Sequence, residues 1–265
     1  MFLPKANRRI FFDLLGSDEA ARTVCLSHSL TADSSMWAEQ VPQLLAAGFK
    51  VLRVDMRGHG SSDTVHGDYT MDELADDVAY VISALKVGPV DFVGLSIGGM
   101  LGQSLALRYP ELIRTAIFAD TLPAAVPAAE PVWIERKRTA QEAQSLAPLA
   151  ESTMARWLTV EFRENRPERW RQIYESILAT DVSGFLGCVH AVRTFDFTRQ
   201  LGGLNTPTLI ICGADDPGTP AQENRRMAEM IPGARYVEIA DSRHFPNVER
   251  PDQFNRTMID WLNGF

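Results

Sequence analysis

The ten residues VDFVGLSIGG, at positions 90–99, decide the fold of this chain. Their first six residues, Val90–Leu95, are almost all apolar and predict a strand buried on both faces. Residues 97–109 then follow a helical pattern that ends before a proline. Ser96 stands between the two, so the sequence places it on a sharp turn from a strand into a helix.

Ser96 has the surroundings that a serine nucleophile needs. Gly94 and Gly98 flank it in a Gly-x-Ser-x-Gly pattern, and we expect a larger side chain at either glycine to collide with neighbouring backbone. The start of the following helix presents free amides, which favour negative charge that develops beside the hydroxyl. The alternative is a packing turn in which Ser96 only caps the helix. Since strand, glycines and helix occur together, we predict that Ser96 is a nucleophile.

Short apolar runs alternate with helical patterns along most of the chain. Near-continuous apolar runs are typical of parallel strands covered on both faces, and the runs are Thr23–His28, Lys50–Met56, Val90–Leu95, Arg114–Asp120, Thr208–Cys212 and Arg235–Ile239. The alternation predicts an α/β fold with a mostly parallel, doubly wound sheet. Arg9–Leu15, with a turn near Gly16-Ser17, reads instead as an antiparallel hairpin at the sheet edge.

One long stretch departs from this alternation. From Leu122 to Gln200 the sequence contains helical patterns and no convincing strand. We interpret residues 122–200 as a helical cap inserted into the sheet domain, which residues 1–121 and 201–265 form. The cap is expected above the carboxyl ends of the strands, where open α/β sheets bind ligands.

A serine hydroxyl needs a base, and the chain has five histidines. Where a serine stands on such a turn, the chain order is serine, acid, histidine, which leaves His190 and His244. His190 lies in an apolar helical pattern of the cap, which favours a core or rim position. His244 follows the last predicted strand, so a loop can bring it over Ser96. We therefore predict His244 as the base.

The acid should follow a strand between Ser96 and His244. The strand Thr208–Cys212 ends in Gly-Ala-Asp-Asp-Pro, and we prefer Asp216 over its neighbour Asp215. Asp120, at the end of an earlier strand, is the alternative. The acid would hold one tautomer of His244 and stabilise its charged form.

Two backbone amides are candidates for an oxyanion hole. The Ile97 amide directly follows the nucleophile, and the Leu30 amide lies in the loop after the first parallel strand. His28 is expected to fix that loop, and His59 to orient the backbone of the turn after the second parallel strand.

Composition narrows the class of partner and the compartment. The formal charge is −8, which disfavours general binding to nucleic acid or to an anionic membrane, and no apolar run is long enough to span one. Met1–Lys5 does not resemble a signal peptide, and three widely spaced cysteines indicate reduced thiols. We therefore expect a cytoplasmic protein, without a disulfide or a metal site, whose partner is a small molecule.

Taken together, these residues resemble the α/β-hydrolase superfamily along nearly the whole chain, and within it the 3-oxoadipate enol-lactonases. The matching segments are Leu26–Leu30 with Met36-Trp37, Arg53–Ser62, Gly94–Gly99, Trp133 with Arg136, Arg156-Trp157 with Phe162, Cys188–Asp196, Thr206–Thr208, Gly213–Pro220 and His244–Pro251. Three residues depart from that branch: His28 replaces an asparagine, Thr31 a glycine, and Arg243 a small residue. Thr31 and Arg243 are expected to border the pocket.

The resemblance implies a lactone or ester substrate that carries a carboxylate, opened through an acyl-enzyme on Ser96 without a metal or organic cofactor. Arg136 is then the candidate partner for the carboxylate, with Trp133 packed on the ligand body. The alternative for Arg136 is a solvated helix face. The sequence leaves both a monomer and a homodimer open.

Three other functions fit the same scaffold. A carboxylesterase of different acyl specificity would turn over simple aryl esters faster than an enol-lactone. A cofactor-free perhydrolase or haloperoxidase would require peroxide and a carboxylic acid. A non-catalytic ligand receptor would lack the complete set of Ser96, Asp216 and His244, which argues against it.

Overall fold

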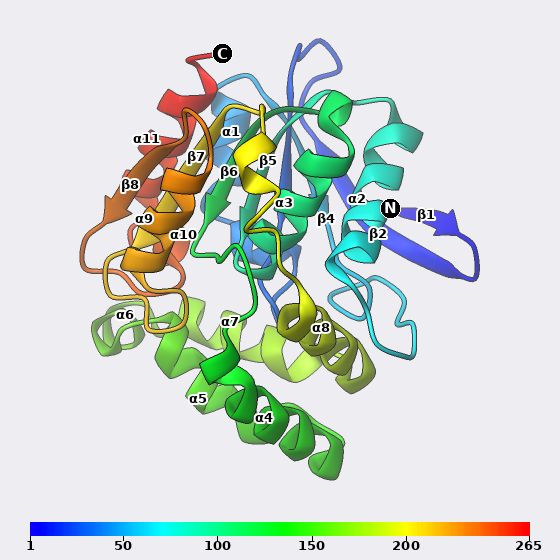
Figure 1. The fold of residues 1–265 in the computed structure, drawn as a ribbon, viewed down its shortest axis with the longest axis vertical. Helices are drawn as coiled ribbons and strands as arrows, with labels where there is room; N and C mark the ends of the chain where they lie inside the picture. The colour runs from blue at the N-terminus through cyan, green and yellow to red at the C-terminus, as the bar shows by residue number, and fades with distance from the viewer.

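Eight strands form one sheet in a computed structural model that describes residues 1–265 (Figure 1). The strand order is β1-β2-β4-β3-β5-β6-β7-β8. The strands are β1 Phe2–Lys5, β2 Arg8–Leu15, β3 Thr23–Ser27, β4 Lys50–Val54, β5 Val90–Leu95, β6 Ile113–Ala119, β7 Thr208–Gly213 and β8 Arg235–Ile239. From β4 to β8 all neighbours pair in parallel, which confirms the predicted α/β sheet.

Helices cover both faces of the sheet (Figure 1). On one face α2 (Met71–Leu85) packs on α3 (Ile97–Arg108) beside β5. On the other, α1 (Val41–Ala46) lies near α11 (Pro251–Leu262), where Gln40 donates a 2.9 Å hydrogen bond to Asn255. The remaining helices of the sheet domain are α9 Ala221–Met230 and α10 Pro246–Glu249. Every residue of β5 is buried, so the strand that precedes Ser96 lies in the core.

The antiparallel edge differs from the predicted hairpin. β2 pairs antiparallel with β1 on one side and with β4 on the other. The hairpin turn is at Ala6-Asn7, where Ala6 has a φ of 54°, and not at Gly16-Ser17. Gly16 does end β2, but β3 enters the sheet on the far side of β4, so those residues join strands that are not neighbours.

Five helices are inserted between β6 and β7, in the stretch predicted to form the cap (Figure 1). They are α4 Glu130–Ala143, α5 Ala147–Trp157, α6 Val160–Asn165, α7 Pro167–Ala179 and α8 Val182–Thr194. The two ends of the insertion meet at an antiparallel bridge between Ala124 and Asp196. In Figure 1 these helices lie across the end of the sheet at which β5, β6 and β7 finish. The insertion is thus helical and lies where a ligand site is expected.

Candidate active site

Ser96 occupies the turn between β5 and α3 in a conformation that few residues adopt. Its φ is 58° and its ψ −120°, outside the regions favoured by residues with a side chain. Two hydrogen bonds hold the turn, because the Ser96 amide donates to Ala119 O at 2.9 Å and the Thr121 hydroxyl donates to Ser96 O at 2.8 Å. Strain of this kind costs about 1–3 kcal/mol and is concentrated at functional sites.

Both glycines around Ser96 are required by close backbone contact. A Cβ atom on Gly94 would lie 2.2 Å from Gly98 O, and one on Gly98 would lie 2.3 Å from Ser27 O. Both oxygens belong to the backbone, so neither can move aside for the added atom. This confirms the steric prediction made from the Gly-x-Ser-x-Gly pattern.

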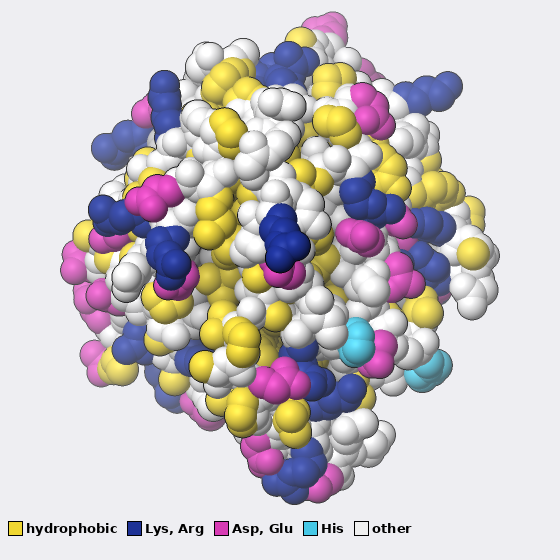
Figure 2. All heavy atoms as spheres, in the orientation of Figure 1, with side chains coloured by type: hydrophobic (Ala, Val, Ile, Leu, Met, Phe, Trp, Pro, Cys, Tyr) yellow, Lys and Arg dark blue, Asp and Glu magenta, His cyan; other side chains and the backbone are white.

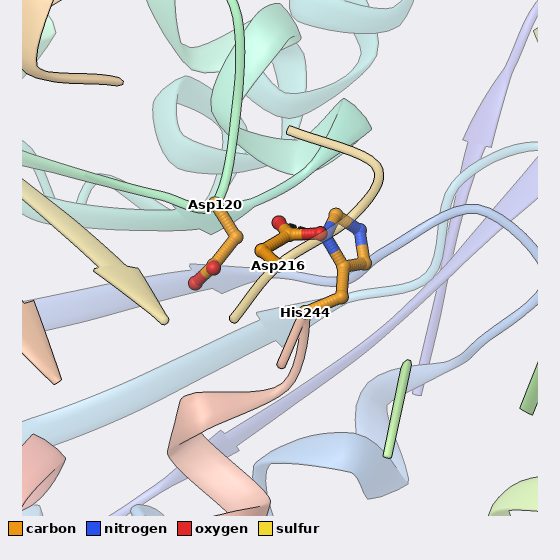
Figure 3. Close-up of side chains that lie close together, drawn as sticks. All are labelled: Asp120, Asp216 and His244. Carbon is orange, nitrogen blue, oxygen red and sulfur yellow. Dashed lines mark hydrogen bonds and ion pairs between the residues drawn. The ribbon is translucent and has the colours of Figure 1, made fainter. Parts of the chain in front are cut away.

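Asp216 lies against His244 at the carboxyl edge of the sheet (Figure 3). The distance from His244 Nδ1 to Asp216 Oδ2 is 2.7 Å. Asp216 also accepts from Gly218 N at 2.7 Å and from the Thr219 hydroxyl. Burial disfavours its charge, but the charge and hydrogen bond of His244, together with the hydrogen bonds from Thr219 and Gly218, outweigh burial and hold the pKa of Asp216 at about 2. Asp215 is exposed and forms no hydrogen bond or ion pair with His244.

Asp120 is a second buried carboxyl group next to this pair. Figure 3 shows it on the side of Asp216 away from the histidine, and side-chain atoms of the three residues lie within 4.8 Å of one another. Asp120 Oδ1 accepts from Gly213 N at 2.8 Å, whereas Oδ2 is buried without a partner. Burial, followed by the charge of Asp216, raises the pKa of Asp120 well above its ordinary value. The raised pKa favours the protonated, neutral form of Asp120 beside the charged Asp216.

Ser96 and His244 line one cavity of about 620 Å³, together with Asp216 and Thr219. The Ser96 hydroxyl forms no hydrogen bond with the His244 ring in this structure; such contacts often shorten only around a bound substrate. The cavity volume is in the range of small-molecule sites. The fold thus brings the three residues predicted from sequence to one pocket.

Leu30 and Ile97, whose amides are the predicted oxyanion hole, line the same cavity. Ile97 is the first residue of α3, where amides have no partner within the helix, and the Leu30 amide donates to no protein acceptor. His28 accepts from Met56 N at 2.9 Å through Nε2, and its Nδ1 lies 2.8 Å from Ser29 O. These contacts tie the Leu30 loop to the segment after β4. Both amides are thus available to an oxyanion.

His59 lies behind this loop and not in the cavity. Its Nδ1 is 3.2 Å from Arg57 O, which agrees with an expected role in orienting backbone. Burial, together with the nearby charge of His28, lowers the pKa of His59 to about 3. His59 is therefore neutral over the physiological range.

In the cap, Arg136 and Trp133 both line the cavity. Arg136 is 7% exposed, so the alternative of a solvated helix face is wrong for this residue. Its guanidinium lies 5.8 Å from the centroid of the Trp133 ring and donates to the Thr153 hydroxyl at 2.8 Å. The solvated face of α4 instead carries Arg138, which pairs with Glu135 and Glu142.

Arg156 is a second cavity arginine that the sequence analysis did not assign to the site. It is half-buried on α5 and forms neither a hydrogen bond nor an ion pair. Burial, with repulsion from Arg156, lowers the pKa of Arg136 to about 9, and burial also lowers that of Arg156. By contrast, Arg193 at the same cavity pairs with Glu130, with Nε to Oε2 at 2.9 Å. The adjacent pair Arg156-Trp157 was the only signal available, and it did not show where the arginine points.

Two residues expected to border the pocket do not line it. Thr31 is buried behind the Leu30 loop, with a φ of 60°. The Arg243 guanidinium turns away from the cavity and donates to Ala155 O at the end of α5. His190 was expected in the core or at the rim of the cap. It is partly exposed, and its Nδ1 lies 3.3 Å from Asp68 Oδ2.

Charges of both signs are mixed over the molecular face shown in Figure 2. Hydrophobic side chains are visible over part of α4, in keeping with the exposed Val132 and Ile134. None of the helices has the length and apolar character needed to cross a membrane.

Comparison with known proteins identifies the class. Residues 22–251 match the model of the alpha/beta hydrolase fold family, so the chain belongs to that family. Within it, 3-oxoadipate enol-lactonase 2 of Acinetobacter baylyi is 33% identical over 239 residues, which are 90% of this chain and 88% of that protein.

Solved structures agree with this relationship. The enol-lactonase from Burkholderia xenovorans LB400 matches with a TM-score of 0.94 at 32% identity, over 99% of this chain and 100% of that one. A thermophilic esterase from Thermogutta terrifontis, solved with malate bound, matches with a TM-score of 0.88 at 29% identity, over 97% and 94%. The protein is an α/β hydrolase related to enol-lactonases and esterases.

Proposed function

We propose that this protein is a serine hydrolase that opens a carboxylate-bearing lactone, in the manner of a 3-oxoadipate enol-lactonase. Residues 1–121 and 201–265 would form the catalytic core and residues 122–200 the cap that selects the substrate. Ser96 would be the nucleophile, Asp216 and His244 its acid and base, and the Leu30 and Ile97 amides its oxyanion hole.

The observation that carries the proposal is the pair of unpaired cations in the cavity. Arg136 and Arg156 line the same pocket as Ser96 and His244, and neither forms an ion pair, although the charge of Asp216 acts on the pKa of Arg156 against its burial. Arg136 is buried and Arg156 half-buried, and a cation withdrawn from water without an ion-pair partner is costly, so both favour an anionic ligand. A substrate carboxylate bound there would leave its carbonyl to be aligned with Ser96.

The geometry supports the following sequence of steps. Ser96 Oγ attacks the lactone carbonyl while His244 takes its proton, and Asp216 stabilises the imidazolium. The oxyanion forms beside the Leu30 and Ile97 amides, which are already in place. His244 then protonates the ring oxygen, so the carbon–oxygen bond breaks and the ring opens on Ser96. Water, deprotonated by His244, releases the acid and restores the serine.

The relatives support a substrate of this class. Two of them are enol-lactonases by name, at 33% and 32% identity. The esterase relative was solved with malate, which carries two carboxylates. A cavity with two free arginines suits a molecule with one carboxylate to bind and one carbonyl to attack.

An acyclic ester of a dicarboxylic acid is the second candidate substrate. Val126 and Val132 belong to the cavity lining and are 44% and 52% exposed, so the cavity opens to solvent there. An alcohol leaving group could depart by that opening, whereas a lactone has none to release.

The test compares three substrates with the purified protein: 3-oxoadipate enol-lactone, a monoester of a dicarboxylic acid, and phenyl acetate. The proposal expects the highest kcat/KM for the lactone and a clear preference for either anionic substrate over the neutral ester. Faster turnover of phenyl acetate would reject anion recognition. Product formation only in the presence of peroxide would instead indicate a perhydrolase.

A further inference from the structure

The loop that carries His244 is attached to the cap at the C-terminal end of α5. On one side of the histidine, the Arg243 guanidinium donates to Ala155 O. On the other side, Phe245 N donates to Trp157 O at 3.2 Å, and the two aromatic rings stack with centroids 4.3 Å apart. Both neighbours of the predicted base thus contact the same helix end.

These contacts satisfy groups that α5 cannot satisfy itself. The last carbonyls of a helix have no intrahelical donor, and they carry the negative end of its dipole. Arg243 brings a positive charge and Phe245 an amide to those carbonyls, and Arg243 also reaches Leu158 O at 3.5 Å. The His244 loop therefore supplies hydrogen-bond donors to the C-terminal end of α5, and moving the loop would leave carbonyl groups of that helix without partners.

Glu249, on α10, also contacts both segments. Its Oε1 accepts from both the amide and the hydroxyl of Thr159, each at 2.7 Å. Its Oε2 accepts from Arg243 N at 2.6 Å. Glu249 is only 7% exposed, so its oxygens are largely shielded from water. Both accept hydrogen bonds from the protein, and they link the start of α6 to the residue before His244.

The helix end that receives the loop also carries Arg156, one residue after Ala155 and one before Trp157. Arg156 and His244 line the same cavity. The distance from the His244 ring to the Arg156 guanidinium is therefore set by the contacts between the end of α5 and the His244 loop. We call this set of contacts, made by Arg243, Phe245 and Glu249, the joint. Because the two segments are far apart in sequence, these hydrogen bonds and the ring stacking fix that distance.

We propose that Glu249 and Arg243 are positioning residues that hold the His244 loop and Arg156 as one unit. The unit would align the base with the substrate carbonyl while the arginine holds the carboxylate. This use of Arg156 rests on the proposed function, whereas the joint itself does not.

The first test is Glu249→Gln, which replaces one carboxylate oxygen by an amide that donates where an acceptor is needed. We expect kcat to fall about ten- to a hundredfold on both phenyl acetate and an anionic monoester, since His244 is displaced. KM should rise for the anionic ester alone. Glu161→Gln, an exposed change on the neighbouring α6, is the matched control and should keep wild-type values. A folded Glu249→Gln variant with wild-type kcat and KM would overturn the proposal.

The second test does not depend on activity. Arg243→Met removes the guanidinium and keeps much of the side-chain volume, so it remains informative if Glu249→Gln does not fold. Hydrogen exchange followed by mass spectrometry should accelerate in residues 155–163 and in residues 242–249 together. Acceleration confined to one of the two segments would refute the joint. Paired acceleration in Arg243→Met, together with a wild-type protein that is inactive on both esters, would reject the proposed function and support the joint.

Discussion

The carboxyl edge of the sheet and the cap present opposite kinds of polar group to one cavity. At the sheet edge, Asp216 accepts three hydrogen bonds, one of them from His244. In the cap, Arg136 has one hydrogen bond, to Thr153, and Arg156 has none. Polar groups that already hydrogen-bond to one another are preorganised for a reaction, whereas a charged group without an ion-pair partner in the protein is available to bind a ligand. The contrast suggests that chemistry resides in the sheet and selection in the cap.

Removing the nucleophile should have the largest effect. Ser96→Ala is expected to lower kcat by about 10⁶, because the base and oxyanion amides alone cannot form an acyl-enzyme. Kinetics on phenyl acetate will measure the loss, and mass spectrometry with a fluorophosphonate should show labelling of the wild type only. Labelling or full activity in the variant would mean that the nucleophile is another residue and that the carboxyl edge of the sheet does not carry the reaction.

The acid should come next. Asp216→Asn leaves the shape of the site but holds the wrong tautomer of His244, so we expect kcat to fall by about 10⁴. Asp215→Asn is the matched control, since its side chain is exposed and one position away. A severe effect of the control with a mild effect of Asp216→Asn would reverse the assignment.

How well each region could be predicted follows from how local its determinants are. The turn at Ser96 was predictable, because strand, glycines and helix are contiguous in sequence. The position of Asp216 was predictable for a similar reason, since it follows β7 at a fixed spacing. Arg156 was not assigned, because its direction depends on how α5 packs against the rest of the cap. The contact of Arg243 with Ala155 joins residues 88 positions apart, and no local pattern encodes it.

Arg156→Met tests whether the cap selects the substrate. A hydrogen bond to a charged group contributes about 1.5–3 kcal/mol, so kcat/KM for an anionic monoester should fall roughly ten- to a hundredfold. Turnover of phenyl acetate and the melting temperature should both change little, because Arg156 is only half-buried and forms no hydrogen bond or ion pair within the protein. Arg138→Met, on the exposed face of α4, is the control and should affect neither substrate. Equal losses on both esters would mean that Arg156 serves the reaction and not selection.

The smallest effect concerns Asp120, the sheet-edge carboxyl with one unpaired oxygen. Burial raises its pKa, so between pH 4 and the raised pKa the folded protein keeps a proton that the unfolded chain has lost. Folding stability then decreases as pH rises through that window. Asp120→Asn cannot ionise and still accepts from Gly213 N, so it should be more stable than the wild type near pH 8.

Thermal unfolding of the two proteins at pH 8 and pH 4 measures this, and the gain should vanish toward the acid end. The sign of the result shows whether the sheet edge, like the cap, holds a group whose charge is costly. A gain at pH 8 that fades toward pH 4 means that the folded protein disfavours an ionised Asp120 beside Asp216. A loss at pH 8 would mean that the folded protein stabilises the ionised carboxylate, so that the pKa of Asp120 would not be raised and the sheet edge would supply a partner for its charge.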